Sequence, residues 1–397
     1  MSPLVMSAFS VTTCLGAGRA ATLAALREGR GGLAPCRFDE LPIDAYTGEA
    51  EGLDAHPLTG EWAGFDCRNN RLAALTLGQD GFLEAVAAAK SRHGAARIGV
   101  FVGTSTSGIL ETEVAYRHRD PASGVLPAGF DYARRHNTYA LGRFVREYLG
   151  LGGPAFAVST ACAATSKVFA SAARMIATGV CDAAVIGGAD TLCATTLFGF
   201  HALGVMAQGP CRPFDATRGG ISIGEGSGFV LLERPRPEHG ADDVLLLGTG
   251  ESSDAHHMSS PHPQGDGARA AMAQALAAAR LQPGDIDYIN LHGTATLVGD
   301  AAEDRAVSAL FGNRVPCNSS KGFTGHTLGA SGVVGAVFGA LAIQNGFLPG
   351  SPHTRMLDPA FTSLYVRTGR EARISRVLCN AFGFGGVNCS LILGRAV

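Results

Sequence analysis

The sequence predicts an α/β protein, because strand-like and helix-like segments alternate along most of its 397 residues. Hydrophobic residues make up 46% of the chain and charged residues only 17%, so much of the chain must be buried. Glycine occurs 54 times, which indicates close backbone packing and many tight turns. The length is enough for one large domain or two of ordinary size.

In the first half of the chain, three strand-like segments surround a helix of small residues. Residues 96–103 (ARIGVFVG) and 155–160 (AFAVST) are predicted to be buried strands. Residues 161–179 are predicted to form a helix that ends at Gly179, since glycine is preferred just beyond a helix. The next strand is expected at 182–190.

The second half begins after a segment near residue 240 that contains two prolines and several charges. A strand is predicted at 244–253, a helix at 267–281, and a strand that enters a loop at 287–296. This series loosely repeats the order of the first. We therefore expect two halves of similar topology, residues 1–240 and 241–397.

One long segment, residues 327–354, contains no Asp, Glu, Lys or Arg. Most of its residues are Gly, Ala, Val and Ser, Gln344 and Asn345 lie within it, and no basic or aromatic belt flanks it. A helix that is apolar all round and does not cross a membrane lies in a core. We interpret the segment as a core helix and expect no membrane span.

Charge and cysteine usage exclude several classes of protein. The net charge of −2 and the pI of about 6.6 give no overall attraction to nucleic acid or to membranes. The ten cysteines form no CxxC pair, which favours reduced thiols over disulfides or a zinc site. The first residues lack the basic region of a signal peptide, so we expect a cytoplasmic protein.

Cys162 lies where a predicted strand meets a predicted helix. A thiol at a helix N-terminus is favoured as thiolate by the helix dipole, and the unpaired N–H groups there can hold an oxyanion. The alternative is a small buried cysteine of the core.

Further polar residues occupy the ends of predicted strands and helices. His292 follows a strand and precedes a Gly-Thr loop, the kind of position where active sites gather. Asp300 and Glu303 are spaced like a helix N-cap and its partner at the third helical position. Lys321 and His326 precede the predicted core helix.

The segment NAFGFGGVN, residues 380–388, alternates phenylalanine and glycine. Phe382 and Phe384 would be core residues in an ordinary strand. The three glycines of this segment would instead permit a mobile loop that carries an aromatic gate.

Together these segments resemble the beta-ketoacyl-[acyl carrier protein] synthases. TACAAT around Cys162, HGTATLVGDAAE, KGFTGH and NAFGFGGVN occur in the order and approximate spacing of that family, and RPFDATRGG, GEGSGFVLLE and SSDAHHMSSP extend the match. The resemblance covers most of the chain from about residue 95 onward. It implies a thiolase-like fold, with two similar α/β halves in a five-layered α-β-α-β-α arrangement.

The resemblance also implies a reaction and its residues. Cys162 would accept an acyl group, and His292 and His326 would donate N–H groups from Nε2 while a malonyl thioester loses CO2. Lys321 would order the two histidines. The product would be a 3-oxoacyl-carrier protein, made without a metal or organic cofactor.

Other positions would bind the substrate. The resemblance places Thr294 and Thr296 along the phosphopantetheine arm of the carrier and makes Phe384 the gating phenylalanine, with Phe382 nearby. The backbone N–H groups of Cys162 and Phe384 would form the oxyanion hole for acyl transfer.

The chain departs from the family at Gly335, where a buried glutamate usually pairs with the lysine. A buried ammonium without a counter-ion is costly. We therefore hypothesise that Glu303, also a family position and one counted among the substrate-binding residues, is the ionic partner of Lys321. The alternative is that Lys321 points partly to water. A start without the usual Val-Thr-Gly favours a specialised polyene or polyketide branch over bulk fatty-acid synthesis.

The expected partners are acyl and malonyl thioesters carried by an acyl carrier protein. Arg68 and Arg71 are candidates for docking this acidic partner, and a solvated helix face is the alternative. Family members pair through a sheet edge, so we expect a homodimer, with a heterodimer containing a chain-length-factor subunit as the alternative.

Three other functions are alternatives to this one. A silent partner subunit would normally lack Cys162, and a thiolase would carry a second cysteine in the glycine-rich loop. A carrier-binding module without catalysis is the third. His256, His257 and His262 lack the carboxylate or thiolate spacing of a metal site.

Overall fold

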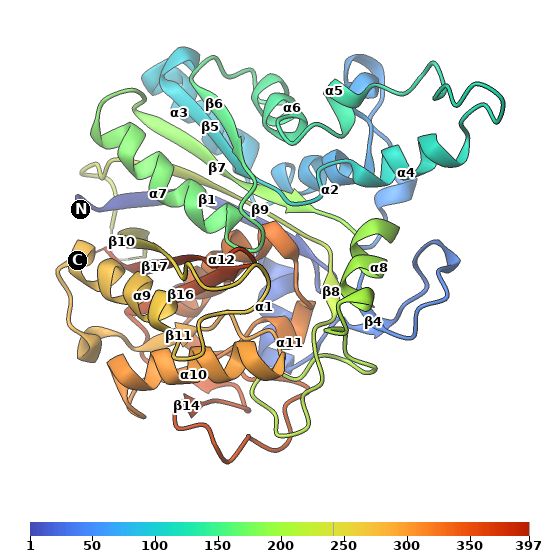
Figure 1. The fold of residues 1–397 in the computed structure, drawn as a ribbon. Coiled ribbons are helices and arrows are strands. Elements are labelled where there is room, and N and C mark those ends of the chain that lie inside the picture. Colours follow the sequence, from blue (N-terminus) through green and yellow to red (C-terminus); the bar gives the residue numbers. More distant parts are fainter. Residues whose placement is uncertain (241, 397) are drawn as a thin grey trace.

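The computed structural model describes residues 1–240 and 242–396 and confirms the α/β prediction. In the described residues, a 12-stranded mixed sheet runs through the whole molecule (Figure 1). Its order is β14 (Leu364–Tyr365), β12 (Pro316–Asn318), β11 (Tyr288–Asn290), β16 (Arg376–Gly383), β17 (Val387–Arg395), β10 (Val244–Ser253), β1 (Leu4–Thr13), β9 (Gly226–Glu233), β7 (Ala183–Asp190), β5 (Ile98–Gly103) and β6 (Ala155–Val158), with β2 (Gly16–Ala17) on β1.

Helices cover both outer faces of the sheet and fill the space between its halves. The helices are α1 (Gly18–Glu28), α2 (Arg68–Leu77), α3 (Phe82–His93), α4 (Ile109–Arg117), α5 (Tyr132–Arg135), α6 (Ala140–Tyr148), α7 (Ala164–Ala177), α8 (Ala194–Ala202), α9 (Asp266–Ala279), α10 (Leu297–Phe311), α11 (Lys321–Thr324) and α12 (Ser331–Asn345). Two small sheets join β3 (Ala34–Pro35), β4 (Tyr46–Gly48) and β8 (Ile223–Gly224), and β13 (Phe347–Leu348) and β15 (Arg370–Glu371).

The strand pairing of the first half recurs in the second. In the first half β1, β9 and β7 pair antiparallel in that order, and β7, β5 and β6 continue in parallel. In the second half β10, β17 and β16 pair antiparallel, and β16, β11 and β12 continue in parallel. β1 and β10 join the two series. The division between residues 240 and 241 stays a prediction, because residue 241 lies outside the described residues.

The arrangement has five layers, as expected of a thiolase-like fold. α2, α3 and α6 pack on the outer face of the first half, and α9, with α10 beside it, covers the second (Figure 1). Between the two halves lie α7, which packs on β5 and β7, and α12, which packs on β9, β16 and β17. α7 and α12 also contact each other. The two central helices thus meet strands from both halves of the chain.

α12 is the core helix predicted from the uncharged segment. Residues Leu328–Asn345 are apolar enough to cross a membrane by length and composition, yet 83% of them are buried inside the protein. Small residues are required there, because a Cβ at Gly332 would lie 2.3 Å from the Ser166 hydroxyl of α7. The helix carries no charge because it is buried among other elements, and at Gly332 its neighbour leaves room only for glycine.

Most predicted elements appear with shifted ends. The predicted helix at 161–179 is α7, which ends at Ala177, and Gly179 follows with φ of +74°. The predicted strand at 287–296 is shorter, because β11 ends at Asn290. The loop that follows turns sharply, with positive φ at Gly293 and Ala295. This turn brings the residues after β11 toward the cavity described below.

Glu233, at the end of β9, holds several elements together. Its buried carboxylate accepts hydrogen bonds from Ser7 at 2.6 Å, Arg92 at 2.7 Å and Arg236 at 2.9 Å, and lies 3.0 Å from His93 Nε2. Burial alone would raise the pKa of Glu233, but the hydrogen bonds and the arginine charges outweigh it and lower the pKa from 4.5 to about 2. These hydrogen bonds of Glu233 therefore connect β1, α3 and the segment after β9.

We predict that Glu233→Gln lowers the free energy of unfolding by about 2 kcal/mol at pH 7, after discounting for the solvent exposure of the arginines. The folded-state pKa of Glu233 lies below its unfolded value. Its contribution is therefore complete above about pH 4.5 and is lost as the pH falls toward 2. Urea denaturation of both proteins at pH 7 and pH 3 measures this. Glu61→Gln, at an exposed position, is the control and should change stability by less than about 0.5 kcal/mol. A difference between Glu233→Gln and wild type that does not shrink at pH 3 would contradict the assignment.

Candidate active site

Cys162 lies in the turn between β6 and α7, two residues before the helix begins. Its side chain is only 6% exposed. The preceding Ala161 has φ of +49°, a left-handed conformation that is strained for a residue with a side chain. The end of β16 packs against this turn, since a Cβ at Gly383 would lie 2.9 Å from the Thr160 carbonyl oxygen. Close backbone contacts therefore fix the position of the thiol.

The thiol of Cys162 is protonated at neutral pH. Burial raises its pKa from 9.0 to about 11, although the charge of Lys321 and a hydrogen bond from the backbone N–H of Phe384 act in the opposite direction. The expectation that the helix N-terminus would favour thiolate was wrong for the free protein. The physical reason is that loss of solvent outweighs the helix dipole and the nearby lysine.

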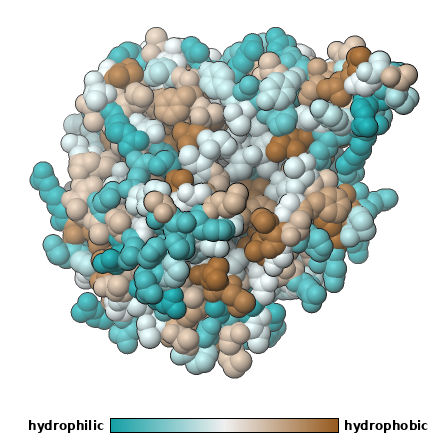
Figure 2. Space-filling view, viewed as in Figure 1, coloured by the Kyte–Doolittle hydropathy of each residue, from teal (hydrophilic) through white to brown (hydrophobic). Residues whose placement is uncertain are grey.

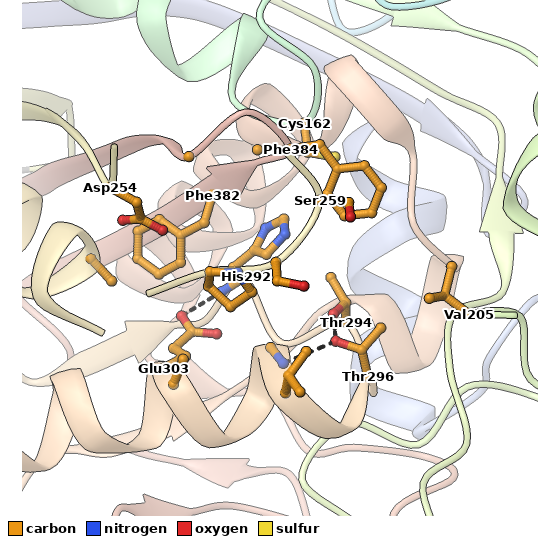
Figure 3. A pocket seen from close by; sticks show the side chains of 18 of the residues that line it. Cys162, Val205, Asp254, Ser259, His292, Thr294, Thr296, Glu303, Phe382 and Phe384 are labelled. Atoms are coloured by element: carbon orange, nitrogen blue, oxygen red, sulfur yellow. Dashed lines mark hydrogen bonds between the residues drawn. The ribbon is translucent and has the colours of Figure 1, made fainter. Parts of the chain in front are cut away.

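The structure brings Cys162, His292 and His326 together, as the sequence predicted. The sulfur and one nitrogen of each ring all lie within 4.8 Å of one another. The two imidazole rings are nearly perpendicular, with centroids 5.4 Å apart. His292 comes from the loop after β11 and His326 from the segment between α11 and α12. Figure 3 shows Cys162 and His292 beside the same cavity.

His326 presents an N–H group at Nε2. Its Nδ1 accepts a hydrogen bond from the backbone N–H of Leu328 at 3.1 Å and lies 3.0 Å from the Ser331 hydroxyl. A backbone N–H can only donate, so the proton of the neutral ring is on Nε2. Burial and the charge of Lys321 lower the pKa of His326 well below its ordinary value. The ring is therefore a neutral donor at pH 7.

His292 is held in the same tautomer by Lys321. The Lys321 ammonium donates to the carbonyl oxygen of His292 and lies 3.4 Å from its Nδ1. Because an ammonium group has no acceptor, Nδ1 must accept and Nε2 must carry the proton. Burial, followed by the charges of Lys321 and His326, lowers the pKa of His292 well below its ordinary value.

Lys321 itself is 5% exposed, which excludes the alternative that it points partly to water. The hypothesis of a direct ion pair with Glu303 was also wrong, because their charged atoms do not approach within 4.0 Å. The Glu303 carboxylate instead accepts the backbone N–H groups of His292 at 2.8 Å and Gly293 at 2.7 Å, and the Asn380 amide at 3.1 Å. Burial lowers the pKa of Lys321, and Glu303 opposes that shift from a longer distance.

The position of the missing family glutamate is occupied by an amide from another element. A Cβ at Gly335 would lie 2.6 Å from Nδ2 of Asn290, which ends β11. The Asn290 side chain is buried, and its Oδ1 has no hydrogen-bond partner among the described residues. A larger residue at 335 would therefore require Asn290 to move.

A cavity of about 250 Å³ leads to Cys162, and Thr294 and Thr296 line it (Figure 3). Their contact with a phosphopantetheine arm stays a prediction. Their hydroxyl oxygens are 3.0 Å apart. Thr296 is also the N-cap of α10, because its hydroxyl accepts the backbone N–H of Gly299 at 3.2 Å. One wall of the cavity is therefore polar and fixed by the start of a helix.

The prediction that Asp300 caps this helix was wrong. Asp300 lies within α10, and its buried carboxylate accepts the backbone N–H groups of Phe214 at 2.8 Å and Ala295 at 3.0 Å. Burial raises its pKa to about 7. Asp300 thus holds the loop that carries Thr294 and Thr296 against a distant segment.

The glycine-rich loop forms the opposite wall. Phe384 is 38% exposed and its ring lies 5.8 Å from that of Phe200, while the ring of Phe382 lies 5.8 Å from that of His292. Gly385 and Gly386 have φ of +83° and +75°, conformations that favour glycine. Both phenylalanines line the cavity, and the role of Phe384 as a gate stays a prediction.

Sequence reasoning missed the residues that anchor this loop. The Asp254 carboxylate accepts the Asn388 amide at 2.7 Å and the backbone N–H of His262 at 2.9 Å. The Asp254 N–H donates to the Gly386 carbonyl at 2.8 Å. The motif that contains Asp254, SSDAHHMSSP, indicated the family. Its hydrogen bond to Asn388, 134 positions away, cannot be read from any local pattern.

The docking prediction was wrong for Arg68, which is buried, and stays a prediction for Arg71, which is half-buried and paired. Arg68 is buried and pairs with the fully buried Glu225 through two hydrogen bonds of 2.6 and 2.8 Å. Arg71 forms two 2.7 Å hydrogen bonds to Asp66. Arg68 therefore holds α2 in place rather than presenting its charge to solvent.

The three central groups lie close enough to hold a metal ion, which would have to displace the protons they carry. A metal requires a thiolate and free ring lone pairs. The site instead presents a protonated thiol and two Nε2–H donors. This arrangement suits an oxygen atom that gains negative charge during a reaction.

Comparison with known proteins places these features in a family. The protein-family model described as "Beta-ketoacyl synthase, N-terminal domain" matches residues 1–237, and the family model described as "Beta-ketoacyl synthase, C-terminal domain" matches residues 244–355. A solved structure titled "Ketosynthase (ApeO) in Complex with its Chain Length Factor (ApeC) from Xenorhabdus doucetiae" is similar with a TM-score of 0.88 and 35% identity, covering 100% of this chain and 98% of that one.

Two curated relatives agree. The mitochondrial 3-oxoacyl-[acyl-carrier-protein] synthase of Arabidopsis thaliana is 38% identical over 61% of this chain and 57% of its own length. The 3-oxoacyl-[acyl-carrier-protein] synthase 2 of Rhizobium meliloti is 36% identical over 75% of this chain and 74% of its own. The fold is that of the thiolase-like condensing enzymes. The chain belongs to the beta-ketoacyl synthase family.

We predict that alkylation of Cys162 by iodoacetamide accelerates about tenfold per pH unit from pH 7 to 10, because the thiolate fraction rises toward a pKa of about 11. Lys321→Met removes a charge that lowers this pKa, so the rate at pH 9 should fall. Mass spectrometry of the Cys162 peptide measures both rates. Half-buried Cys36 is the control and should react equally in the two proteins. A rate that levels off below pH 9 would show that the thiol is more acidic than its surroundings indicate.

Proposed function

We propose that this chain is a 3-oxoacyl-[acyl carrier protein] synthase. It transfers an acyl group to Cys162, decarboxylates malonyl-carrier protein, and joins the two by Claisen condensation. The products are a 3-oxoacyl-carrier protein, CO2 and free carrier. The observation that carries the proposal is a thiol and two neutral imidazoles within 4.8 Å of one another at the end of one cavity.

The first step is acyl transfer to Cys162. The sulfur attacks the carbonyl carbon of the acyl thioester, a new C–S bond forms, and the bond to the carrier sulfur breaks. The proton of the Cys162 thiol leaves with the departing carrier thiol. The backbone N–H groups of Cys162 and Phe384 stabilise the oxyanion, and that of Phe384 already points to the sulfur in the free protein.

The second step is loss of CO2 from the malonyl thioester. The bond to the carboxylate breaks, CO2 departs, and the electron pair forms an enolate whose oxygen accepts hydrogen bonds from Nε2 of His292 and His326. Two neutral donors suit this task, because they stabilise developing charge without giving up a proton. The carbanion then attacks the acyl carbonyl on Cys162, a C–C bond forms, and the sulfur leaves and regains a proton.

The substrates are proposed to arrive on an acyl carrier protein. The curated relatives are named for that substrate, and the narrow cavity suits a thin phosphopantetheine arm. The hydroxyls of Thr294 and Thr296 can bond the amides of the arm from the polar wall. We further propose that the enzyme is soluble and cytoplasmic.

The exposed edge of the main sheet supports a dimer. Among the described strands β6 pairs only with β5, and all four of its residues, including Phe156 and Val158, are half-buried. An unpaired apolar edge is a site for pairing with another chain. We propose a homodimer through β6. The alternative, favoured by similarity to the ApeO–ApeC complex, is a catalytic subunit bound to a chain-length factor in a specialised polyene pathway.

We predict that variants separate the two chemical steps. Cys162→Ala abolishes acyl loading, whereas His292→Ala and His326→Ala retain loading but lower condensation about 10²–10³-fold, because each removes a donor to the enolate. Intact-protein mass spectrometry measures loading, and product analysis measures condensation. His257→Ala, at an exposed position, is the control and should leave both unchanged. Full condensation activity in the Cys162→Ala protein would sink the proposal.

We also predict that the purified chain has twice the 40.8 kDa mass of one copy. Val158→Asp places a charge on the half-buried, unpaired edge of β6 and should convert the dimer to a monomer in light scattering after gel filtration, with the circular dichroism spectrum of wild type showing that the variant is folded. A wild-type monomer that gains mass only with a co-expressed second subunit would favour the heterodimer. Wild-type and Val158→Asp proteins that are both dimers would place the interface elsewhere.

A further inference from the structure

Thr165 is a buried residue that joins the helix of Cys162 to the segment that carries His326. It lies three residues after Cys162, in the first turn of α7, and its side chain is fully buried. Its hydroxyl donates to the carbonyl of Gly329 at 2.6 Å and accepts the backbone N–H of Val333 at 3.0 Å. Gly329 and Val333 lie on either side of the start of α12, so one hydroxyl holds both sides of that start.

These two hydrogen bonds cap α12 from another helix. α12 begins at Ser331, and its N-cap residue, Ala330, has no side chain that can bond the free N–H groups of the first turn. Thr165 supplies that acceptor from α7 and uses its own proton on the carbonyl of Gly329. The position of the start of α12 thus depends on a residue of α7.

The groups that Thr165 bonds are shielded from water. Gly329 and Val333 are buried, like Thr165 itself. The space-filling view shows other side chains over the place where Figure 1 draws α12 (Figure 2). A buried backbone group that loses its partner stays unpaired, which is costly. We therefore expect loss of the Thr165 hydroxyl to shift the start of α12.

The segment that Thr165 holds is the one that orients His326. Leu328, next to Gly329, donates its N–H to Nδ1 of His326 at 3.1 Å, and the Ser331 hydroxyl lies 3.0 Å from the same atom. Leu328 has φ of +50°, a left-handed conformation that is strained for a residue with a side chain. Such a conformation persists only where its surroundings enforce it, and Thr165 bonds the very next residue.

The same segment packs against the groups that hold Cys162. The buried carboxylate of Asp190 accepts the backbone N–H of Ser105 at 2.8 Å, and the Ser105 hydroxyl donates to the carbonyl of Ala161 at 3.3 Å. Ala161 is the strained residue before Cys162. A Cβ at Gly329 would lie 2.7 Å from Oδ2 of Asp190 and 2.8 Å from the Ser105 hydroxyl. Gly329 therefore lies in direct contact with the groups that hold the thiol in place.

We propose that Thr165 is a positioning residue, which sets the distance and orientation of His326 relative to Cys162. The inference rests on the proposed function, in which Nε2 of His326 donates to the enolate oxygen. A donor that is displaced from this oxygen stabilises its charge less well. Acyl transfer to Cys162 uses backbone N–H groups instead, so it does not depend on the position of His326. The Thr165 hydroxyl therefore matters for condensation and not for acyl loading.

Thr165→Val tests this, because valine has nearly the shape of threonine and lacks the hydroxyl. The kcat for condensation should fall about tenfold, while the rate of acyl loading onto Cys162 stays within about twofold of wild type. Thr165→Ser restores the hydroxyl and should return condensation to within about threefold of wild type. Intact-protein mass spectrometry measures loading, and product analysis measures condensation.

A double variant shows whether the effect passes through His326. Thr165→Val combined with His326→Ala should condense as fast as His326→Ala alone, because the ring that Thr165 positions is then absent. Gly329→Ala is a second route to the same result, since its Cβ would push the segment away from Asp190. It should lower condensation about tenfold, and again only where His326 is present. Gly329→Ala also provides the test if Thr165→Val does not fold.

Thr76→Val is the matched control. Thr76 is equally buried, on α2, and its hydroxyl donates to the carbonyl of Leu72 at 2.9 Å. This variant should lose thermal stability and keep both rates.

Four results would overturn the inference. They are a folded Thr165→Val protein that condenses like wild type, an equal loss of loading and condensation, no recovery with serine, and losses that multiply in the double variant. A wild-type protein that fails to load Cys162 or to condense would instead reject the proposed function.

Discussion

The site depends on the contact between the Lys321 ammonium and His292. This one buried group donates to the backbone carbonyl of His292 and lies against its Nδ1, so it sets both the position and the tautomer of the ring. Glu303 holds the same loop from the other side through the N–H groups of His292 and Gly293. Lys321 and Glu303 thus hold the backbone of His292 through its carbonyl and its N–H group. The histidine therefore has little freedom to rotate.

The same burial that orders the site also suppresses ionisation within it. The thiol of Cys162 and both imidazoles are neutral at pH 7, although a cation lies nearby. The three groups that face the substrate are therefore uncharged before the reaction. New charge develops on the substrate oxygen, at the point where the N–H donors are directed.

Much of this arrangement could be predicted from local sequence. Cys162 at a strand–helix junction, His292 at a strand end and the uncharged helix after His326 are short-range features, and the motifs identify their family. The errors concern long-range contacts. Arg68 looks like a surface residue of a helix, but its partner Glu225 lies 157 positions away and buries it. Asp300 has the spacing of a helix N-cap, but its carboxylate accepts the backbone N–H groups of Phe214 and Ala295 instead.

The placement of α12 has a consequence for how the protein is made. This helix is encoded near the end of the chain, yet it packs on β9 and α7 of the first half as well as on β16 and β17. While the ribosome is still short of residue 345, α7 can cover β5 and β7, but the part of β9 that α12 covers stays open. The first half therefore keeps part of its apolar inner surface exposed until residue 345 has been translated.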